Sequence, residues 1–237
     1  MQISAPIYKL KRRAKLLARK ETMPLHEALD RVAQKEGFQS WSHLSSVKPK
    51  SSPAAIVFSQ LNAGDMILLG ARPGHGKTLL GLEILTHASA IGKTGFFFTL
   101  DYQERDVSER LLDLGFDQSS CENTIVIDTS DEISADYIVN GLKKFDGPAV
   151  VVIDYLQLLD QKRTNPNLDD QLKLLNRYLK DTGTVCAVIS QVDRSFDLSS
   201  KSMPDRSDIR LPNPLDLSLF DKICFLNDGK IQLDTAA

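Results

Sequence analysis

A glycine-rich loop between an apolar run and a helical segment constrains the fold of this chain more than any other feature. The apolar run at 66–70 predicts a strand, and residues 71–78 after it read Ala-Arg-Pro-Gly-His-Gly-Lys-Thr. In a Walker A loop, which opens a helix in this way, backbone N–H groups surround the phosphates of a nucleotide. Alanine at position 71, where the strict pattern has glycine, is the one departure. The setting between strand and helix predicts a site for ATP or a related triphosphate.

The residues of this loop suit separate tasks in phosphate binding. Gly74 and Gly76 allow the backbone to turn its N–H groups inward, and the helix N-terminus adds a partial positive charge. Lys77 is expected to reach the β- and γ-phosphates, and the hydroxyl of Thr78 is expected to bind Mg²⁺. The predicted nucleotide-binding residues are Arg72, Gly74, His75, Gly76, Lys77, Thr78 and Leu79.

Apolar runs and helical patterns alternate from residue 66 onward. This alternation indicates βαβ units, and therefore an α/β fold with a mostly parallel central sheet flanked by helices. Several runs are apolar without interruption, as burial on both faces of a sheet requires. The predicted strands are 66–70, 95–100, 124–127, 149–153, 185–189 and 222–226, and the predicted helices are about 77–91, 103–114, 134–145 and 168–181.

Polar side chains follow three of the predicted strands, at the sheet edge where open α/β folds bind ligands. Asp154 ends the run Val-Val-Val-Ile, which is the Walker B arrangement, and is expected to hold Mg²⁺ opposite Thr78. Asp101 would orient an attacking water, and Gln191 would sense the γ-phosphate. Each of these residues could instead cap a helix or form a turn. Their position beside a Walker A loop favours catalytic roles for Asp101, Asp154 and Gln191.

Positive charge is concentrated at the N-terminal end of the chain. Residues 1–50 carry eleven Lys or Arg and four Asp or Glu, a net charge of +7, and the remainder carries 18 and 27, a net charge of −9. Helical periodicity predicts a basic helical segment over 1–45, a linker over 46–56 and an ATPase domain over 57–237. The basic helices are expected to dock on a protein partner or support oligomerisation. Nucleic-acid binding and a merely solvated face are the alternatives.

The composition argues against several other classes of protein. No run approaches the roughly 20 apolar residues that span a bilayer, and the N-terminus lacks the apolar core of a signal peptide. A mitochondrial presequence is also disfavoured, because serine is scarce and lysine outnumbers arginine in the first 20 residues. The cysteines Cys121, Cys186 and Cys224 have no metal-ligand spacing, and an odd, unpatterned set fits a reducing cytoplasm. We therefore expect a cytoplasmic protein without a membrane segment.

Four motifs, in order, resemble the C-terminal ATPase domain of DnaB-type replicative helicases. Alanine at the start of the Walker A loop is typical of that family, and Tyr-Leu-Gln after the Walker B aspartate is the most diagnostic part. The resemblance covers about 57–228 with the spacing intact, and implies a RecA-like P-loop fold. The motifs are Ala71-Arg72-Pro73 with Gly76-Lys77-Thr78, Val-Ile-Asp-Tyr-Leu-Gln-Leu-Leu at 152–159, Ile-Ser-Gln at 189–191 with Arg194-Ser195, and Arg-Ser-Asp-Ile-Arg at 206–210.

This resemblance implies ATP hydrolysis with Mg²⁺ in a homo-oligomeric ring that holds single-stranded DNA. Gln191 would couple the γ-phosphate to the loop at 193–212, which corresponds to the loop that faces DNA in the central channel. Binding there would use phosphate contacts without base readout. A surface loop without this role is the alternative, and a recombinase-type RecA relative lacks support from Tyr-Leu-Gln. The predicted DNA contacts are Arg194, Lys201, Arg206 and Arg210.

Two departures from the family predict slow hydrolysis. The family has glutamate where this chain has Asp101, and a carboxylate misplaced by about 1 Å can cost roughly 100-fold in rate. In the family, strands beyond the position of Ala237 carry a basic residue that enters the neighbour's ATP site. Such fingers are worth roughly 10³–10⁵ in turnover in other phosphoryl-transfer enzymes. The alternative function is therefore a nucleotide-gated regulatory or partner-binding module without helicase activity.

Overall fold

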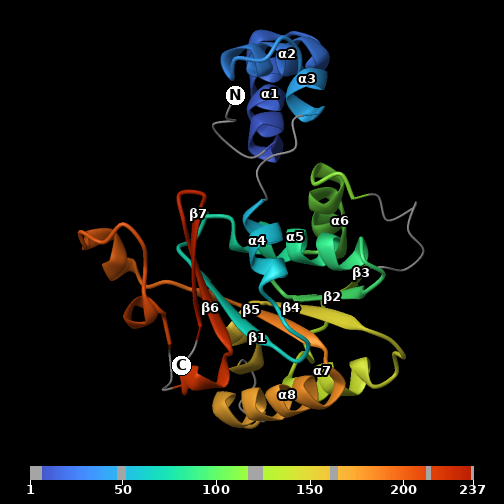
Figure 1. The fold of residues 1–237 in the computed structure, drawn as a ribbon, viewed down its shortest axis with the longest axis vertical. Coiled ribbons are helices and arrows are strands. Elements are labelled where there is room, and N and C mark those ends of the chain that lie inside the picture. The colour runs from blue at the N-terminus through green and yellow to red at the C-terminus, as the bar shows by residue number, and fades with distance from the viewer. Residues whose placement is uncertain (1–6, 47–51, 117–124, 161–164, 212–214, 236–237) are drawn as a thin grey trace. The chain divides into compact units, whose positions relative to one another are not determined.

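The computed structural model describes residues 7–46, 52–116, 125–160, 165–211 and 215–235 (Figure 1). The chain divides into two compact units, Met1–Ser52 and Pro53–Ala237. Cys121 and part of the predicted linker, 47–51, lie outside the described residues. The last residues of that linker belong to helix α4 (Pro53–Ser59). Pro53 occupies the first turn of this helix, a position that suits proline.

The N-terminal unit is a small helical cluster with a core of its own. It contains α1 (Ile7–Glu21), α2 (Leu25–Lys35) and α3 (Trp41–Ser46). The carboxylate of Asp30 accepts a hydrogen bond of 2.8 Å from the Trp41 N–H, which fixes the start of α3 against α2. The hydroxyl of Ser40 accepts a second one from the His43 N–H, as expected of an N-cap. The buried core consists of Leu10, Ala14, Ala28, Val32, Ala33, Phe38 and Leu44.

The larger unit is built on one sheet, in which the described strands follow the order β3-β2-β4-β5-β1-β6-β7. Neighbouring strands are parallel except for β7, which pairs antiparallel with β6 and forms the second half of a hairpin. The mostly parallel sheet predicted from the sequence is confirmed. The strands are β1 (Met66–Ala71), β2 (Thr94–Thr99), β3 (Ile125–Asp128), β4 (Ala149–Asp154), β5 (Val185–Gln191), β6 (Lys222–Asn227) and β7 (Lys230–Thr235).

Helices cover both faces of this sheet, as uninterrupted apolar strands require. On β4, Val150 and Val152 pack into one buried cluster, whereas Val151 and Ile153 pack into the other. The first cluster includes side chains of α4, α5 (Lys77–Ser89) and α6 (Glu104–Asp113). The second includes side chains of α7 (Ala135–Leu142) and α8 (Leu168–Thr182), which lie together on the opposite face in Figure 1.

Two further observations concern membrane insertion and the cysteine residues. None of the helices in the described part of the chain is both long and apolar enough to cross a membrane. Cys186 and Cys224 are buried free thiols inside β5 and β6, where each behaves as a small apolar side chain.

Candidate nucleotide site

Strand register brings the predicted site residues to one edge of the sheet. Ala71 at the end of β1 pairs with Gln191 at the end of β5. Asp154 at the end of β4 pairs with Ile189 of β5 on one side and with Thr99 of β2 on the other. Because parallel strands end at a common edge, the Walker A loop, Asp154 and Gln191 lie at the same level of the fold.

The Walker A loop has the backbone conformation that its glycines predict. Gly74 has φ +83° and Gly76 has φ +89°, in the left-handed region that other residues rarely adopt. Gly76 is the N-cap of α5, so the loop ends directly at the helix N-terminus. Sequence reasoning missed Gly81, where an added Cβ would lie 2.9 Å from Cγ1 of Val152. This glycine lets α5 lie close against β4, which carries the Walker B aspartate.

The predicted Mg²⁺ residues are in direct contact. The hydroxyl of Thr78 donates a hydrogen bond of 2.7 Å to Oδ2 of Asp154, whose side chain is 1% exposed. Burial raises the pKa of Asp154, against the lowering effects of the Thr78 hydroxyl and the Lys77 ammonium. A hydroxyl and a carboxylate are the oxygen ligands that Mg²⁺ prefers. Among the described residues, no group of three or more His, Cys, Asp or Glu could hold a metal ion.

Lys77 is held in a partly desolvated position that favours an anionic ligand. Burial lowers the pKa of its ammonium group, while the nearby Asp154 and Asp101 raise it and Arg72 lowers it. The negative charge of a triphosphate would stabilise the protonated lysine further. Asp101 is exposed at the end of β2, and its N–H donates to the Thr99 hydroxyl at 3.2 Å. The charges of Asp101 and Asp154 therefore both act on Lys77.

Arg110 is a member of this charged group that the sequence did not reveal. Its guanidinium lies over the ring of Tyr102, 4.4 Å from the centroid, and its charge lowers the pKa of Asp154. Arg110 comes from α6, which also carries Arg105, and an arginine on such an amphipathic helix is usually an ordinary surface residue. Only the packing of α6 beside the sheet edge brings it near the site.

Two long-range contacts hold the Walker A loop. Arg72 donates through Nη1 to the Val192 carbonyl at 3.0 Å and through Nε and Nη2 to the Asp197 carboxylate at 3.0 and 2.7 Å. His75 accepts at Nδ1 from the Asp228 N–H at 3.3 Å, in the turn of the β6–β7 hairpin. Arg72 and His75 were predicted to bind nucleotide, and the structure shows both engaged with other parts of the protein.

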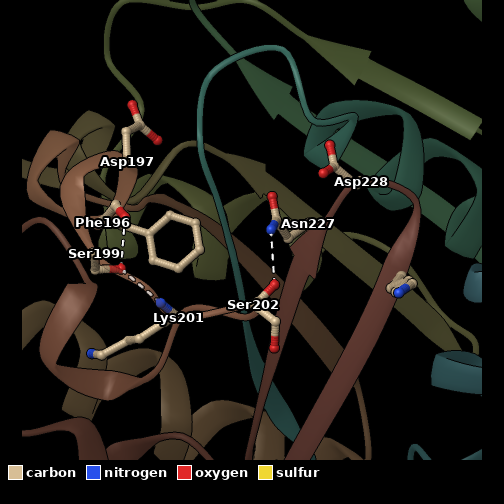
Figure 2. A pocket seen from close by; sticks show the side chains of 8 residues that line it. Phe196, Asp197, Ser199, Lys201, Ser202, Asn227 and Asp228 are labelled. Atoms are coloured by element: carbon tan, nitrogen blue, oxygen red, sulfur yellow. Dashed lines mark hydrogen bonds between the residues drawn. The ribbon is translucent and has the colours of Figure 1, made fainter.

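The partners of Arg72 and His75 border a shared pocket. Asp197 and Asp228 line a cavity of about 360 Å³ between the hairpin and the 3-10 helix η3 (Arg194–Leu198). Figure 2 shows Asp197 and Asp228 on opposite sides of this pocket, with Asn227 donating to the Ser202 carbonyl between them. The pocket thus lies between the two segments that contact the Walker A loop through Arg72 and His75.

Gln191 contacts the loop that follows it in the sequence. Its backbone carbonyl accepts from the Arg210 N–H at 2.8 Å, and the Gln157 side chain donates to the Arg210 carbonyl at 3.2 Å. With Tyr155, these residues line a cavity of about 190 Å³. Oε1 of Gln157 and Oγ of Ser190 are buried without a hydrogen-bond partner in the described part of the chain. Gln157 after the Walker B aspartate, Gln191 and Arg210 therefore form one connected group.

The described part of the predicted DNA-facing loop is folded. The N–H of Asp193 donates to the Asp208 carbonyl at 2.7 Å, and Phe196 is buried. A capping box between Asp205 and Asp208 fixes η4 (Arg206–Asp208). Residue 212 of this loop lies outside the described residues.

The four predicted DNA contacts differ in their surroundings. Lys201 donates to the carboxylates of Asp205 and Asp208 at 2.7 and 2.9 Å, so its charge is neutralised locally. Arg206 donates to a backbone carbonyl of β7 at 3.2 Å. Arg194 and Arg210 are exposed, and neither forms a salt bridge with another described residue. These two arginines are the members of the set that remain available to a phosphate.

The sequence of this chain matches a known family and a known relative. The family model described as "ATPase: KaiC" matches residues 55–204. The replicative DNA helicase DnaB of Mycoplasma genitalium is 24% identical over 208 residues, which cover 70% of this chain and 44% of the relative. The chain therefore spans less than half the length of that relative.

Solved structures share the fold at low sequence identity. One of them, an isolated ATPase domain, has a TM-score of 0.59 at 18% identity, covering 78% of this chain and 79% of the other. A DnaB-like replicative helicase, from a study of its interactions with primase, has a TM-score of 0.64 at 19% identity, with 97% and 71% covered. The KaiC-like protein PH0186 from Pyrococcus horikoshii has a TM-score of 0.51 at 20% identity, with 68% and 70% covered. These similarities confirm the RecA-like fold.

Proposed function

Because this chain belongs to the KaiC family of ATPases, we propose that it binds ATP with Mg²⁺ and hydrolyses it slowly, acting on or with single-stranded DNA. The observation that supports this most is the hydrogen bond between Thr78 and Asp154, with the desolvated Lys77 beside it. A protein with this role would work in the cytoplasm, where ATP and replicating DNA are found.

Triphosphate binding would use the loop after β1 and the aspartate at the end of β4. Backbone N–H groups of the loop from Gly74 to Thr78 would surround the β-phosphate, and the Lys77 ammonium would contact the β- and γ-phosphates. The Thr78 hydroxyl and the Asp154 carboxylate would hold Mg²⁺ directly or through its water shell. Bound Mg²⁺ would neutralise charge on the phosphates during phosphoryl transfer. It would also favour the ionised form of Asp154, against the effect of burial.

Slow hydrolysis would follow from the residue at the end of β2. Asp101 would orient the attacking water, but its side chain is one methylene shorter than the glutamate of DnaB-type helicases. A carboxylate about 1 Å too far from the water orients it poorly. Substrate binding, which depends on the Walker A loop, would be unaffected.

Single-stranded DNA would contact the loop after β5 through Arg194 and Arg210. Because the Arg210 N–H bonds to the Gln191 carbonyl, a shift of Gln191 toward a γ-phosphate would move Arg210 with it. Resemblance to DnaB-type helicases implies a homo-oligomeric ring in which this loop faces the bound strand. Contacts with phosphates alone would make the binding independent of sequence.

Steady-state ATP hydrolysis with and without a single-stranded oligonucleotide tests this proposal. We expect a slow basal rate that rises severalfold on addition of DNA, and loss of both rates in Lys77→Ala. Lys144→Ala, which removes an exposed lysine just after α7, is the matched control and should keep both rates. A protein that binds MgATP but shows no response to DNA would contradict the DNA part of the proposal.

A nucleotide-gated binding module is the second candidate, and the contacts of Arg72 and His75 favour it. They connect the nucleotide loop to two other segments, so occupancy could alter a surface that a partner reads. This function requires MgATP binding but no turnover. Tight MgATP binding without hydrolysis, with or without DNA, would support it over the ATPase proposal.

A further inference from the structure

The N-terminal unit carries positive charge that its own carboxylates do not neutralise. Residues 7–46 contain nine Lys or Arg and four Asp or Glu, a net charge of +5. Three of the four carboxylates are already engaged. Glu21 pairs with Arg31 at 2.7 Å, Glu36 lies 3.9 Å from Arg13, and Asp30 caps α3.

The excess charge is concentrated on α1, which has seven basic residues and a single acidic one at its last position. The face formed by Leu10 and Ala14 is buried in the core of the unit. Arg19 and Lys20 are exposed at the C-terminal end of the helix. Leu16 on the same helix is 58% exposed. The exposed side chains described on α1 are therefore mainly basic; the basic ones run from Arg13 to Lys20, over about 10 Å of helix axis, and one apolar side chain lies among them.

We propose that these exposed basic side chains of α1 bind the phosphodiester backbone of a nucleic acid, independently of the ATP site. A row of cations on one helix matches the closely and regularly spaced charges of a nucleic-acid strand, and it would bind by releasing condensed counterions. Lysine and arginine predominate there, so the contacts would position the strand without reading bases. The rest of the chain is net negative, so this unit would concentrate nucleic acid near a core with little nonspecific affinity of its own.

Covalent attachment gives this surface a further effect. The unit forms its own compact body, Met1–Ser52, and joins the ATPase unit at Pro53. A weak phosphate-binding site tethered to a second site raises the effective concentration of DNA at that second site. The inference does not require the proposed function, because α1 would bind nucleic acid even in a protein that hydrolyses no ATP.

Fluorescence anisotropy on the full chain, without nucleotide and over about 50–200 mM salt, tests the proposal with a labelled strand of roughly 30 nucleotides and its duplex. The variant Arg19→Gln with Lys20→Gln removes two adjacent exposed charges. We expect roughly 10–30-fold weaker binding at about 0.1 M salt, and a slope of log affinity against log salt that is flatter by about 1.4 for the single strand. In a Lys77→Ala background, the Arg19→Gln, Lys20→Gln change should weaken nucleic-acid binding by the same factor. This result would hold even if the ATPase proposal were wrong.

The variant Lys143→Gln with Lys144→Gln is the matched control. It removes the same charge from an adjacent exposed pair just after α7, near the start of β4 and therefore at the sheet edge opposite the nucleotide site. It should bind nucleic acid as the wild type does.

Equal affinities for all three proteins, or equal losses in both variants, would overturn the proposal. Unchanged nucleic-acid binding together with lost self-association in the α1 variant would also overturn it, and would identify the surface as a protein-docking face. Whichever of the two, single strand or duplex, loses more affinity in the α1 variant is the form that α1 binds.

Discussion

Thr78 and Asp154 meet at 2.7 Å although 76 positions separate them in the chain. Their contact could be expected from the sequence, because Asp154 ends one apolar run and Thr78 directly follows the loop at the end of another. Strand ends of this kind gather at one edge of a parallel sheet. The partners of Arg72 could not be expected in the same way. Asp197 follows Arg72 by 125 residues and has no flanking pattern that marks it as a partner.

Replacement of Asp101 by glutamate should increase turnover. The longer side chain would carry the carboxylate about 1 Å closer to the water that attacks the γ-phosphate, and a correction of that size is worth up to about 100-fold. We expect a higher kcat with little change in KM, because Asp101 lies outside the phosphate-binding loop. Asp131→Glu, at an exposed turn before α7, controls for the added methylene. An unchanged or lower kcat would show that another feature limits the rate.

Glu83 on α5 should make stability depend on pH. Burial raises the pKa of its carboxyl group from 4.5 to about 7. Between these values the folded state keeps the proton and the unfolded state does not, so the free energy of unfolding falls as pH rises through this range. Glu83→Gln should remove this effect and stabilise the protein by about 1–3 kcal/mol at about pH 8, with little change at about pH 4. Urea denaturation at the two pH values measures the difference.

Exposed Glu109 on α6 provides the control for this measurement. Its carboxylate pairs with Arg105 on the helix surface, where the net effect of an ion pair is small. Glu109→Gln should therefore have nearly the same free energy of unfolding as the wild type at both pH values. If the two variants respond alike at the higher pH, the desolvated position of Glu83 is not the source of the pH dependence.

At the scale of elements, helices and strands lie where the sequence predicted them wherever the apolar periodicity is strong. The predicted helix at 77–91 is α5 (Lys77–Ser89), and the predicted strand at 149–153 is β4. Helix α4 was missed, because Ser-Ser-Pro-Ala-Ala has the composition of a linker and only tertiary burial of Ala54 and Val57 stabilises it. The close approach of α5 to β4 was also hidden, since a glycine inside a helix gives no sign of what it faces.

Gly81→Ala should destabilise the protein, although alanine normally favours a helix over glycine. The new Cβ would lie 2.9 Å from Cγ1 of Val152 and 3.3 Å from Cδ1 of Ile189, so α5 or the sheet must shift. We expect a loss of about 1–3 kcal/mol in the free energy of unfolding. Gly141→Ala in α7 meets no atom within 4 Å and should stabilise by about 0.5–1 kcal/mol. Opposite signs in thermal or urea unfolding check both expectations.

At the scale of the whole molecule, the sequence indicated the α/β architecture and the nucleotide edge, but not how that edge is connected to the rest. The contacts of Arg72 and His75 cross from the Walker A loop to the segments on either side, and neither segment has a motif that predicts them. Side-chain pairing over such separations depends on the final packing. The folded state of the loop after β5 was equally hidden, because its polar composition resembles that of an unstructured surface segment.

A ring, if this chain forms one, should depend on bound nucleotide. A nucleotide that contacts two neighbouring copies binds the assembled form more tightly than a single chain, so MgATP or a slowly hydrolysed analogue should favour association. We expect a solution mass well above the 26.3 kDa of one chain when analogue and Mg²⁺ are present, measured by light scattering. Lys77→Ala should keep the mass found without nucleotide. A mass that ignores nucleotide in the wild type would contradict a nucleotide-linked assembly.

The anchoring of the Walker A loop by Arg72 and His75 also has a thermodynamic consequence. A free glycine-containing loop samples many conformations, and a ligand that selects one of them loses part of its affinity to the ordering. Here, side-chain contacts from two neighbouring segments restrict the loop before any ligand arrives. Preorganisation of this kind would strengthen nucleotide affinity and make the association rate insensitive to loop rearrangement.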